Sequence, residues 1–337
     1  MTATLKTLAA ELGITPAAVS MALRNHPRIS EKTRSRAKAL ARKRGYIPSP
    51  AFRRSGAMRA RKAQGAMPMA LVLQDHPHGG LGISTHVETV GKVAAGFGYQ
   101  LQVHHATGSD ATRLGSVLYA RGVEAVLLGR IFHKSFLTDF PWKHFSVVAL
   151  DAGHWLPPCH TVLPDVACAT VEAVRRVLRA GCRRVGIYEF REEVEPVDWV
   201  DRLGAVAAAK EICLVSRAKF FHKTAAPYDE AAFVGWLRDA RPDAIIGQTP
   251  ACYWWQKKHA VRGARVLSLS LQMDPVEKKD GLAGFVHDHH ALATVAIKLL
   301  DSEVRNFERG KPPIPTRLLV TMPWNAGSRL RPRQTAA

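Results

Sequence analysis

The residues most able to do chemistry are the basic ones gathered near the N-terminus. Residues 1–66 hold five lysines and ten arginines against two glutamates, a net charge of +13 within a total of +20 for the 337 residues. Concentrated positive charge attracts phosphate polyanions, because binding releases the counterions condensed on them. A protein that is merely soluble and basic would spread its charge more evenly. The asymmetry therefore predicts an N-terminal segment that binds nucleic acid.

Groups of residues that would support catalysis or hold a metal are few. His104-His105 and His287-Asp288-His289-His290 are the densest potential ligands, but no cysteine or glutamate spacing completes a site around them. Five scattered cysteines form neither a CxxC pair nor a disulfide framework, which is typical of a reducing compartment. Nucleophile elbows, phosphate-binding glycine loops and HExxH motifs are all missing. We therefore expect no enzyme, no metal site and no cofactor.

Three short helices are expected over residues 1–46. In the first, apolar residues recur at i, i+3, i+4 and i+7 until Gly13. Thr15 and Ser30 are expected to cap the second and third helices, because a side-chain oxygen satisfies amide groups at a helix N-terminus. Two short helices joined by a tight turn predict a helix-turn-helix. The inward-facing positions are Leu5, Leu8, Ala9, Leu12, Val19, Ala22, Leu23, Thr33, Ala37, Leu40 and Ala41.

Residues 47–66 form a basic, proline-containing connector, and a larger α/β body follows. Strand-like and helix-like segments alternate from residue 69 onward, which indicates parallel sheets covered by helices. The expected strands are Met69–Gln74, Gln100–His104, Ala125–Leu128, Ser146–Leu150, Arg184–Tyr188, Ala244–Ile246, Arg265–Leu269 and Leu318–Thr321. The expected helices include 84–97, 165–180, 200–212, 229–240 and 291–309. No apolar run approaches the roughly 18 residues of a membrane span, and no export signal is present, so a cytoplasmic protein is expected.

One string of residues near the N-terminus carries a specific resemblance. It runs Leu8-Ala9-x-x-Leu12-Gly13-Ile14-Thr15-x-x-Ala18-Val19-Ser20-x-Ala22-Leu23, then Ile29-Ser30-x-x-Thr33-Arg34, then Gly45-Tyr46-Ile47-Pro48. Over residues 4–50, in one register and without gaps, it resembles the DNA-binding headpiece of the LacI (lactose repressor) family of bacterial transcription regulators. The resemblance implies a small all-α helix-turn-helix headpiece at 1–46, a basic hinge at 47–66, and an effector-binding and dimerisation domain at 67–337. That body would be periplasmic-binding-protein-like, with two doubly wound α/β subdomains.

Weaker resemblances to the family continue through the body. They are carried by Asp165 with Gly181-Cys182-Arg183-Arg184-Val185, by Pro242-Asp243-Ala244-Ile245-Ile246, and by Asn306-Phe307-Glu308-Arg309-Gly310-x-Pro312. They imply an N-subdomain at about 67–162 and 289–317, and a C-subdomain at about 163–288 and 318–330.

The resemblance also implies which residues contact DNA. They are Leu5, Thr15, Pro16, Ala17, Ser20, Met21, Arg24, Arg28, Ser30 and Thr33, with Arg53, Arg54 and Met58 from the hinge. The family commonly has polar residues after the capping hydroxyl and Arg at the position of Met21, whereas Pro16, Ala17 and Met21 offer only apolar contacts. Specificity would then depend more on Arg24, Arg28, DNA shape and the connector. The alternative for Met21 is a core position. About half of the basic side chains on the helices are expected to touch phosphates.

The connector departs from the family at one further position. Family members usually have Leu nine residues after the Tyr of the Tyr-x-Pro segment, inserted into the minor groove by paired hinge helices. Counting from Tyr46 gives Ser55, which cannot wedge base pairs apart. Phe52 or Met58 is the substitute wedge in one interpretation. In the other, the arginine-rich connector simply occupies a narrow minor groove.

The family binds effectors between its subdomains, at the carboxyl ends of the strands. Near those positions stand Asp165, Arg202, Gln248, Ser270 and Asp288. Arg202 is offset by one position and Ser270 replaces a frequent carboxylate, which puts a sugar effector in doubt. Asp165 is equally suited to capping a helix.

The resemblance thus implies a cytoplasmic, nucleoid-associated homodimer on a near-palindromic operator in double-stranded DNA. A small-molecule effector would control it, and repression is the expected mode. The alternative is a small-molecule binding protein whose basic arm binds nucleic acid without sequence preference. An enzyme built on the same body is a weaker third possibility.

Overall fold

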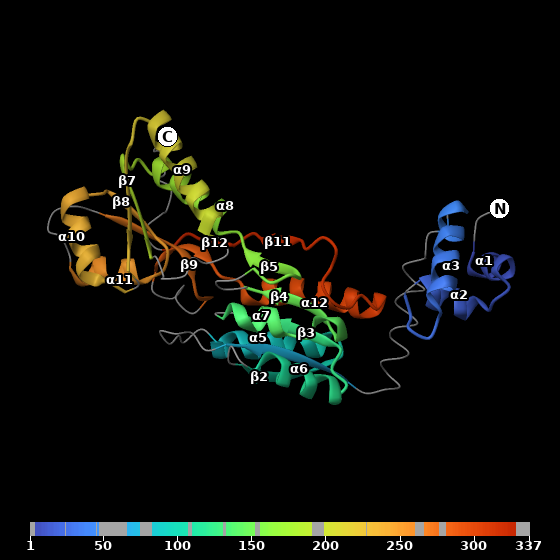
Figure 1. Cartoon of the computed structure of the whole chain (residues 1–337). Helices are drawn as coiled ribbons and strands as arrows, with labels where there is room; N and C mark the ends of the chain where they lie inside the picture. Colours follow the sequence, from blue (N-terminus) through green and yellow to red (C-terminus); the bar gives the residue numbers. More distant parts are fainter. Residues whose placement is uncertain are drawn as a thin grey trace. The chain divides into compact units, whose positions relative to one another are not determined.

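The computed structural model describes residues 4–23, 25–44, 46, 66–74, 83–106, 110–130, 133–151, 156–190, 199–226, 228–259, 266–275 and 281–327. Contacts along the chain divide it into two compact units. Unit 1 comprises Met1–Ala152, Pro157–Val162 and Ala293–Arg317, and unit 2 comprises Gly153–Leu156, Leu163–Leu292 and Leu318–Ala337. Each unit is built around its own sheet (Figure 1).

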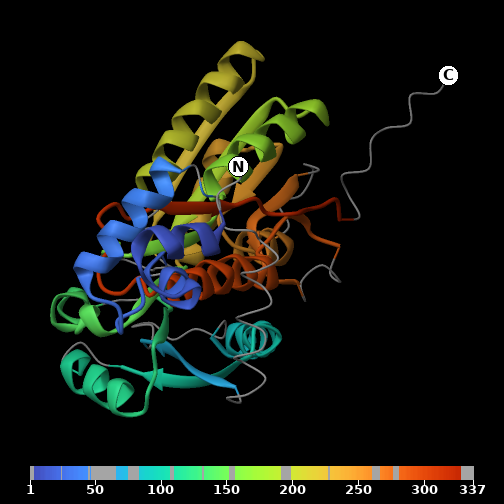
Figure 2. The same ribbon diagram turned by 90° about the vertical axis from the view of Figure 1, so that its right-hand side faces the viewer.

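The first three helices form a small bundle with a core of its own (Figure 2). They are α1 (Leu5–Leu12), α2 (Pro16–Leu23) and α3 (Glu31–Lys43). The side chains buried in its core are Leu8, Ala9, Val19 and Ala41, with Leu5, Leu12, Ile14, Leu23, Leu40 and Tyr46 packed around them. Local chemistry fixes the helix boundaries: Gly13 ends α1, Thr15 Oγ1 accepts a hydrogen bond from Ala18 N at 3.1 Å, and Ser30 Oγ accepts one from Thr33 N at 3.3 Å. The three-helix headpiece predicted from the sequence is confirmed.

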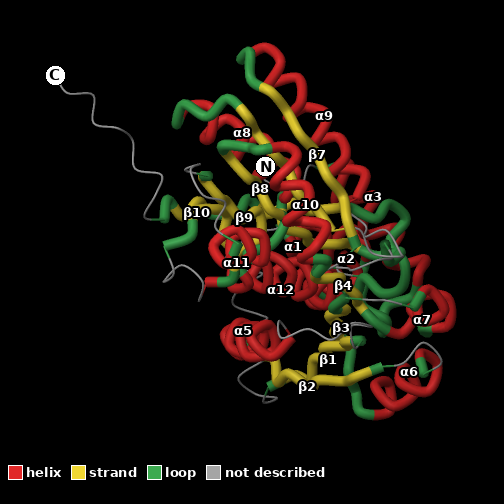
Figure 3. Tube along the Cα trace, turned by 90° about the vertical axis from the view of Figure 1, so that its left-hand side faces the viewer, coloured by secondary structure: helices red, strands yellow, loops and turns green. Residues whose placement is uncertain are grey.

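Unit 1 contains most of a six-stranded sheet in the order β11-β5-β4-β3-β1-β2. Its strands are β1 (Met67–Leu73), β2 (Tyr99–His105), β3 (Ala125–Leu128), β4 (Ser146–Leu150), β5 (His160–Pro164) and β11 (Arg317–Val320). The pairs among β1 to β5 are parallel. The accompanying helices are α5 (Ile83–Gly96), α6 (Ala111–Ala120), α7 (Lys134–Asp139), the 3-10 turn Trp142–His144 and α12 (His289–Asn306), as Figure 3 shows. Parallel strands joined by helices are the pattern that the alternating sequence predicts.

Unit 2 is arranged in the same way around a sheet of order β12-β10-β9-β8-β6-β7. Its strands are β6 (Arg184–Phe190), β7 (Lys219–Ala225), β8 (Ala244–Gly247), β9 (Leu267–Met273), β10 (Ala283–Val286) and β12 (Trp324–Asn325). Only the short pair β10–β12 is antiparallel among the described pairings. The helices are α8 (Val166–Arg179), α9 (Trp199–Val215), α10 (Glu230–Ala240) and α11 (Ala251–Lys258).

The core of unit 2 has two layers, one on each side of its sheet. On one side α8 and α9 bury aliphatic residues against Val185 and Ile187 of β6. On the other side α10 and α11 pack against Tyr188 and Phe190, in a cluster rich in aromatic rings (Figure 1). Because side chains alternate along a strand, residues of β6 pack into both layers. The carboxyl end of β6 lies between the two helix layers, where folds of this kind place ligand sites.

The expected strands are found: β3 and β4 have the predicted bounds, and the ends of the others move by up to four residues, most at β9, expected at Arg265–Leu269. The sequence analysis missed β5, β7, β10, β12 and the helices α6, α7 and α11. β10 has four residues including a glycine, and β7 is an edge strand with Lys219, His222 and Lys223 on it, so neither gives a continuous apolar signal. Within the described residues no helix is long and apolar enough to cross a membrane.

Candidate DNA-binding surface and effector pocket

One side of α2 faces away from the headpiece core. Val19 and Ala22 are buried, whereas Pro16 and Ala17 are exposed. Met21 is half-buried, and it does not belong to the apolar cluster that forms the headpiece core. Its thioether is therefore accessible at the surface, as contact with a thymine methyl group requires. Ser20, one residue earlier on the same side, is half-buried as well.

A hydroxyl group caps each headpiece helix: Thr4 caps α1, and the candidate DNA contacts Thr15 and Ser30 cap α2 and α3. Thr15 Oγ1 accepts the amide of Ala18, so its own proton remains available to a phosphate oxygen. Ser30 Oγ lies 2.9 Å from Thr33 Oγ1 at the start of α3. Helix N-termini attract anions through their unpaired amides and dipole, so both places suit phosphates. Leu5, also among the candidate DNA contacts, packs partly against the headpiece core.

The basic side chains of the headpiece divide into two groups. Arg44 donates two hydrogen bonds to Glu11 Oε2, at 3.0 and 3.2 Å, and so joins α3 to α1. Arg34 Nη1 donates to Asn25 O at 3.0 Å and holds the turn after α2. Arg28 is exposed beside that turn. Other exposed cations of the headpiece are Lys6, Lys32, Arg36, Arg42 and Lys43. Among the candidate contacts, Arg24, Arg53, Arg54 and Met58 lie outside the described residues, as do the alternative wedge positions Phe52 and Ser55.

Replacing Met21 by Arg is expected to change the preferred DNA sequence more than it changes non-specific affinity. A guanidinium on the outer side of α2 can donate to guanine, whereas Met21 offers only apolar contact, and one good base contact is worth about 1–3 kcal/mol. Selection from random DNA measures this directly. Ala39→Arg adds the same charge at an exposed position of α3 and serves as the control. An unchanged selected motif for Met21→Arg would show that this side chain does not face a base.

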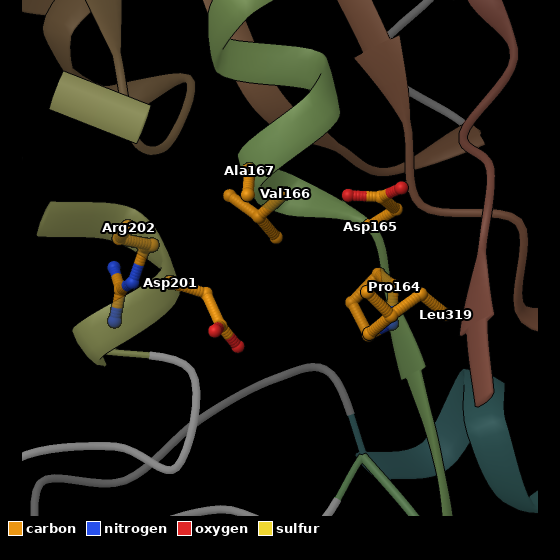
Figure 4. Close-up of a pocket in the computed structure, with 7 residues that line it drawn as sticks. All are labelled: Pro164, Asp165, Val166, Ala167, Asp201, Arg202 and Leu319. Atoms are coloured by element: carbon orange, nitrogen blue, oxygen red, sulfur yellow. The ribbon is translucent and has the colours of Figure 1, made fainter. Parts of the chain in front are cut away.

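A pocket in unit 2 brings together two of the five candidate effector residues (Figure 4). Its lining consists of Pro164, Asp165, Val166, Ala167, Asp201, Arg202 and Leu319. Asp165 Oδ1 accepts the amide of Cys168 at 2.9 Å and so caps α8, as the sequence allows. Arg202, in the first turn of α9, is only 3% exposed, and its guanidinium carbon lies 5.7 Å from the centre of the Trp199 ring.

The lining of this pocket combines polar and apolar groups. Two carboxylates accept hydrogen bonds, a buried guanidinium donates them, and Val166 and Leu319 supply apolar surface. The helices α8 and α9 both begin at the pocket, so their amide ends add positive potential there. Asp201 was not singled out from the sequence, since nothing but its place beside Arg202 distinguishes it from other surface aspartates.

The other three candidate effector residues do not line this pocket. Gln248 follows β8, and its Oε1 accepts the amide of Phe190 at 2.8 Å. Ser270 on β9 is 1% exposed, and its hydroxyl makes no hydrogen bond with any described residue. Asp288 follows β10, and its Oδ1 accepts the amide of Ala291 at 3.0 Å, at the start of α12. All three lie toward the carboxyl edge of the sheet, so their contact with an effector stays a prediction.

The histidine-rich segments do not assemble a metal site in the part of the chain that is described. The rings of His287 and His289 lie 4.5 Å apart, and His289 Nε2 is 3.5 Å from Asp274 Oδ2. His104 lies on β2, where burial and the nearby Arg121 lower the pKa of its imidazole. These histidines therefore lie on the edge strand β2 or directly after β10.

Comparison with known proteins gives the headpiece a family. A family model described as "Bacterial regulatory proteins, lacI family" matches residues 4–49. No curated protein matches the chain. Solved structures match along nearly its whole length. The transcriptional regulator CelR in complex with cellobiose is 18% identical, with a TM-score of 0.57, over 96% of this chain and 100% of that one.

Two further structures extend this likeness. The lac repressor dimer bound to operator and the anti-inducer ONPF is 14% identical, with a TM-score of 0.57, over 96% of this chain and 98% of that one. A LacI-family transcriptional regulator from Corynebacterium glutamicum is 15% identical, with a TM-score of 0.55, over 98% of this chain and 100% of that one. At these identities the likeness establishes the fold of the body.

The fold class predicted from the sequence is therefore confirmed, and the family model that matches the headpiece describes bacterial regulatory proteins. The chain carries the DNA-binding domain of the lacI family of bacterial regulatory proteins at residues 4–49, followed by a two-sheet α/β body with the fold of that family's regulators.

Proposed function

We propose that the protein is a sequence-specific DNA-binding transcription regulator, and most simply a repressor. The observation that carries the proposal is the headpiece, in which a capped α2 turns Pro16, Ala17 and Met21 away from a complete core. A helix presented in this way fits the major groove. The net charge of residues 1–66 supplies the attraction to phosphates on which association depends.

We propose that a small polar effector controls this binding from unit 2. The pocket with Asp165, Asp201 and Arg202 supports the proposal, because its lining combines carboxylate acceptors with the donors of a guanidinium on a residue only 3% exposed. One similar structure is a complex with cellobiose and another contains the anti-inducer ONPF, so this fold accommodates effectors. A ligand that favours one conformation of the body would shift the spacing of two headpieces in a homodimer.

The domain boundaries belong to the same proposal. The headpiece would occupy residues 1–46, a basic hinge 47–66, and the effector-binding and dimerisation domain 67–337. A homodimer would place its two headpieces on a near-palindromic operator, because two-fold protein symmetry is mirrored in the half-sites. The protein would work in the cytoplasm at the nucleoid.

A chain that lacks residues 1–66 is expected to lose protection of every site that the full chain protects. The headpiece holds the only described helix-turn-helix, and typical specific binding exceeds non-specific binding by about 10³-fold or more. Sites are first found by a genome-wide binding map and then footprinted with both chains. Binding by the full chain should also weaken steeply as salt rises, since several phosphates are neutralised at once.

The same experiment separates the alternative function. A binding protein with a non-specific basic arm would give no footprint at any sequence, although its affinity for DNA would still fall with salt. A truncated chain that protected the same sites as the full chain would contradict the regulator proposal. If the full chain protects sites and the truncated chain does not, the genes beside those sites indicate which class of effector to test by thermal shift.

A further inference from the structure

Basic side chains gather at one corner of unit 2, at the end of the sheet opposite the carboxyl edge. The corner lies where α8, α9 and α10 end and where β6 and β7 begin. We call this set the basic corner: Arg183, Arg184, Arg217, Lys219, Arg238 and Arg241. Its charge is separate from that of residues 1–66, and the proposed effector control does not use it.

Hydrogen bonds show that these residues lie together. Lys219 N donates to Arg183 O at 2.7 Å, and Arg184 Nε donates to Arg241 O at 2.7 Å. Arg241 Nε donates to Arg238 O at 3.3 Å. Arg217 precedes Lys219 by two residues, at the turn between α9 and β7. The six cations therefore come from three loops that meet at one place.

Capping of helix ends accounts for two of them. Arg183 Nη1 donates to Cys182 O at 2.9 Å and Leu178 O at 3.4 Å, at the end of α8. The guanidinium of Arg184 donates to carbonyls at the end of α10 and lies 4.9 Å from the centre of the Phe221 ring. Such bonds satisfy carbonyls that a helix leaves unpaired at its C-terminus.

Of the other four cations, Arg241 bonds to the backbone of Arg238 and three face solvent. Arg217, Lys219 and Arg238 are exposed, and their side chains make no hydrogen bond or ion pair with any residue that the structure describes. Of the nearby carboxylates, Asp243 is occupied by the amides of Arg183 and Arg184, at 2.7 and 2.9 Å. Six cations against Asp243 and the exposed Asp239 beside Arg238 leave the corner with an excess of positive charge.

Two arginines of the corner also have a left-handed backbone conformation. The residue that follows α8 in the left-handed region is Gly181, with φ 92°. After α9 and α10 the corresponding residues are Arg217, with φ 52°, and Arg241, with φ 45°. Glycine adopts this conformation without the clash that a Cβ brings, so arginine there costs free energy. The helix dipole favours a cation in the last turn but does not require one at the left-handed residue.

We propose that the basic corner binds the phosphate backbone of a second DNA segment while the headpieces hold an operator. Arginine suits this task because its planar group of five donors matches phosphate oxygens in pairs. Such binding reads no sequence, and it would let one regulator bridge two stretches of DNA. The choice of DNA among polyanions rests on the proposed function, since a headpiece on DNA raises the local concentration of neighbouring duplex.

The test uses the full chain and a labelled random-sequence duplex of about two helical turns, or roughly 20 base pairs. The variant Arg217→Glu/Lys219→Glu/Arg238→Glu reverses three exposed charges of the corner. The control variant Lys143→Glu/Lys210→Glu/Lys298→Glu makes the same change in net charge elsewhere on the body, also at exposed positions. We expect the native chain and the control to bind duplex in two steps at low salt, and the corner variant to lose the second step.

The salt dependence of that second step gives the size of the effect. Each phosphate contact contributes a slope of about −0.9 in a plot of log affinity against log salt concentration, so three contacts give roughly −2.7. Duplex should also protect Lys219, but not Lys210, from acetylation by an amine-reactive ester. Equal losses in both triple variants, or unchanged acetylation of Lys219, would overturn the proposal.

One further arm distinguishes DNA from a lipid surface. Leu214 and Val215, 67% and 82% exposed, end α9 beside the corner and would suit a membrane of anionic lipid. Protection of Lys219 by phosphatidylserine vesicles and not by duplex would therefore refute the proposal. Failure of the regulator function is recognisable separately, because the first binding step, which belongs to the headpieces, would then be missing as well.

Discussion

Replacing Glu303 by Gln is expected to remove a strong pH dependence from the stability of the body. Glu303 lies on α12, and its side chain is only 9% exposed. Burial, and to a lesser extent the nearby charge of Glu308, raise the pKa of its carboxyl group to about 8, although one hydrogen bond from the backbone of Val147 acts in the opposite direction. The folded chain therefore holds a proton that an unfolded glutamate, with a pKa near 4.3, has already lost.

The sign of the effect follows from proton counting. Between about pH 4.3 and pH 8 the native state binds one proton more than the unfolded state, so stability falls as pH rises, by about 1.4 kcal/mol per pH unit. The contribution is fully present below about pH 4.3 and is lost as pH rises through the folded pKa. An amide at this position does not titrate, so the Glu303→Gln variant should show a flatter profile and exceed the native chain in stability above about pH 8.

The free energy of unfolding of both chains, measured by urea denaturation across this pH range, tests this expectation. Glu211→Gln on α9 removes an exposed carboxyl and should leave the native slope unchanged. Equal slopes in the native chain and in Glu303→Gln would show that Glu303 is ionised when folded. The position also bears on the packing of unit 1, since Glu303 Oε1 is 3.8 Å from His160 Nε2. His160 Nδ1 in turn accepts the amide of Thr316, and so connects β5 to the segment before β11.

Sequence analysis predicts the headpiece in detail because short-range chemistry determines it. Thr15, Ser30 and Gly13 mark helix ends through hydrogen bonds or backbone conformations that involve neighbours only three or four residues away. The apolar spacing in α1 fixes which side is buried. No long-range information is needed to place Met21 on the outer side of α2, and the structure agrees that Met21 is outside the apolar core cluster.

In the body, the sequence does not predict elements whose formation depends on contacts with distant residues. β7 pairs along its full length with β6, from Arg184↔Lys219 to Phe190↔Ala225, yet four of its seven residues are polar or charged. Its existence follows from the hydrogen bonds that β6 offers at the sheet edge. Asp165 and Asp288 each accept an amide three residues ahead at a helix start, so local sequence suffices to interpret them as caps. Gln248 accepts the amide of Phe190, which is 58 residues away, and no local pattern contains that contact.

Replacing Gly284 by Ala is expected to destabilise unit 2 strongly. Gly284 lies on β10 opposite Ser270 of β9, with φ 154°. A Cβ there would lie 2.2 Å from the carbonyl oxygen and 2.9 Å from the amide nitrogen of Ser270, so one of the two strands must move. Overpacking and backbone strain each cost about 1–3 kcal/mol, so a loss of roughly 3 kcal/mol or more in the free energy of unfolding is expected.

Gly204→Ala provides the matched control, because Gly204 lies within α9 with no atom within 4 Å of the added methyl group. That change should stabilise the helix by about 0.5–1 kcal/mol. Urea denaturation compares the two variants, and a Gly284→Ala chain as stable as the native one would show that β9 and β10 adapt without cost. Since the headpiece has a core of its own, Gly284→Ala should still bind non-specific duplex while it loses any response to an effector. If Gly284→Ala lost duplex binding together with the effector response, the headpiece would depend on the body for its fold.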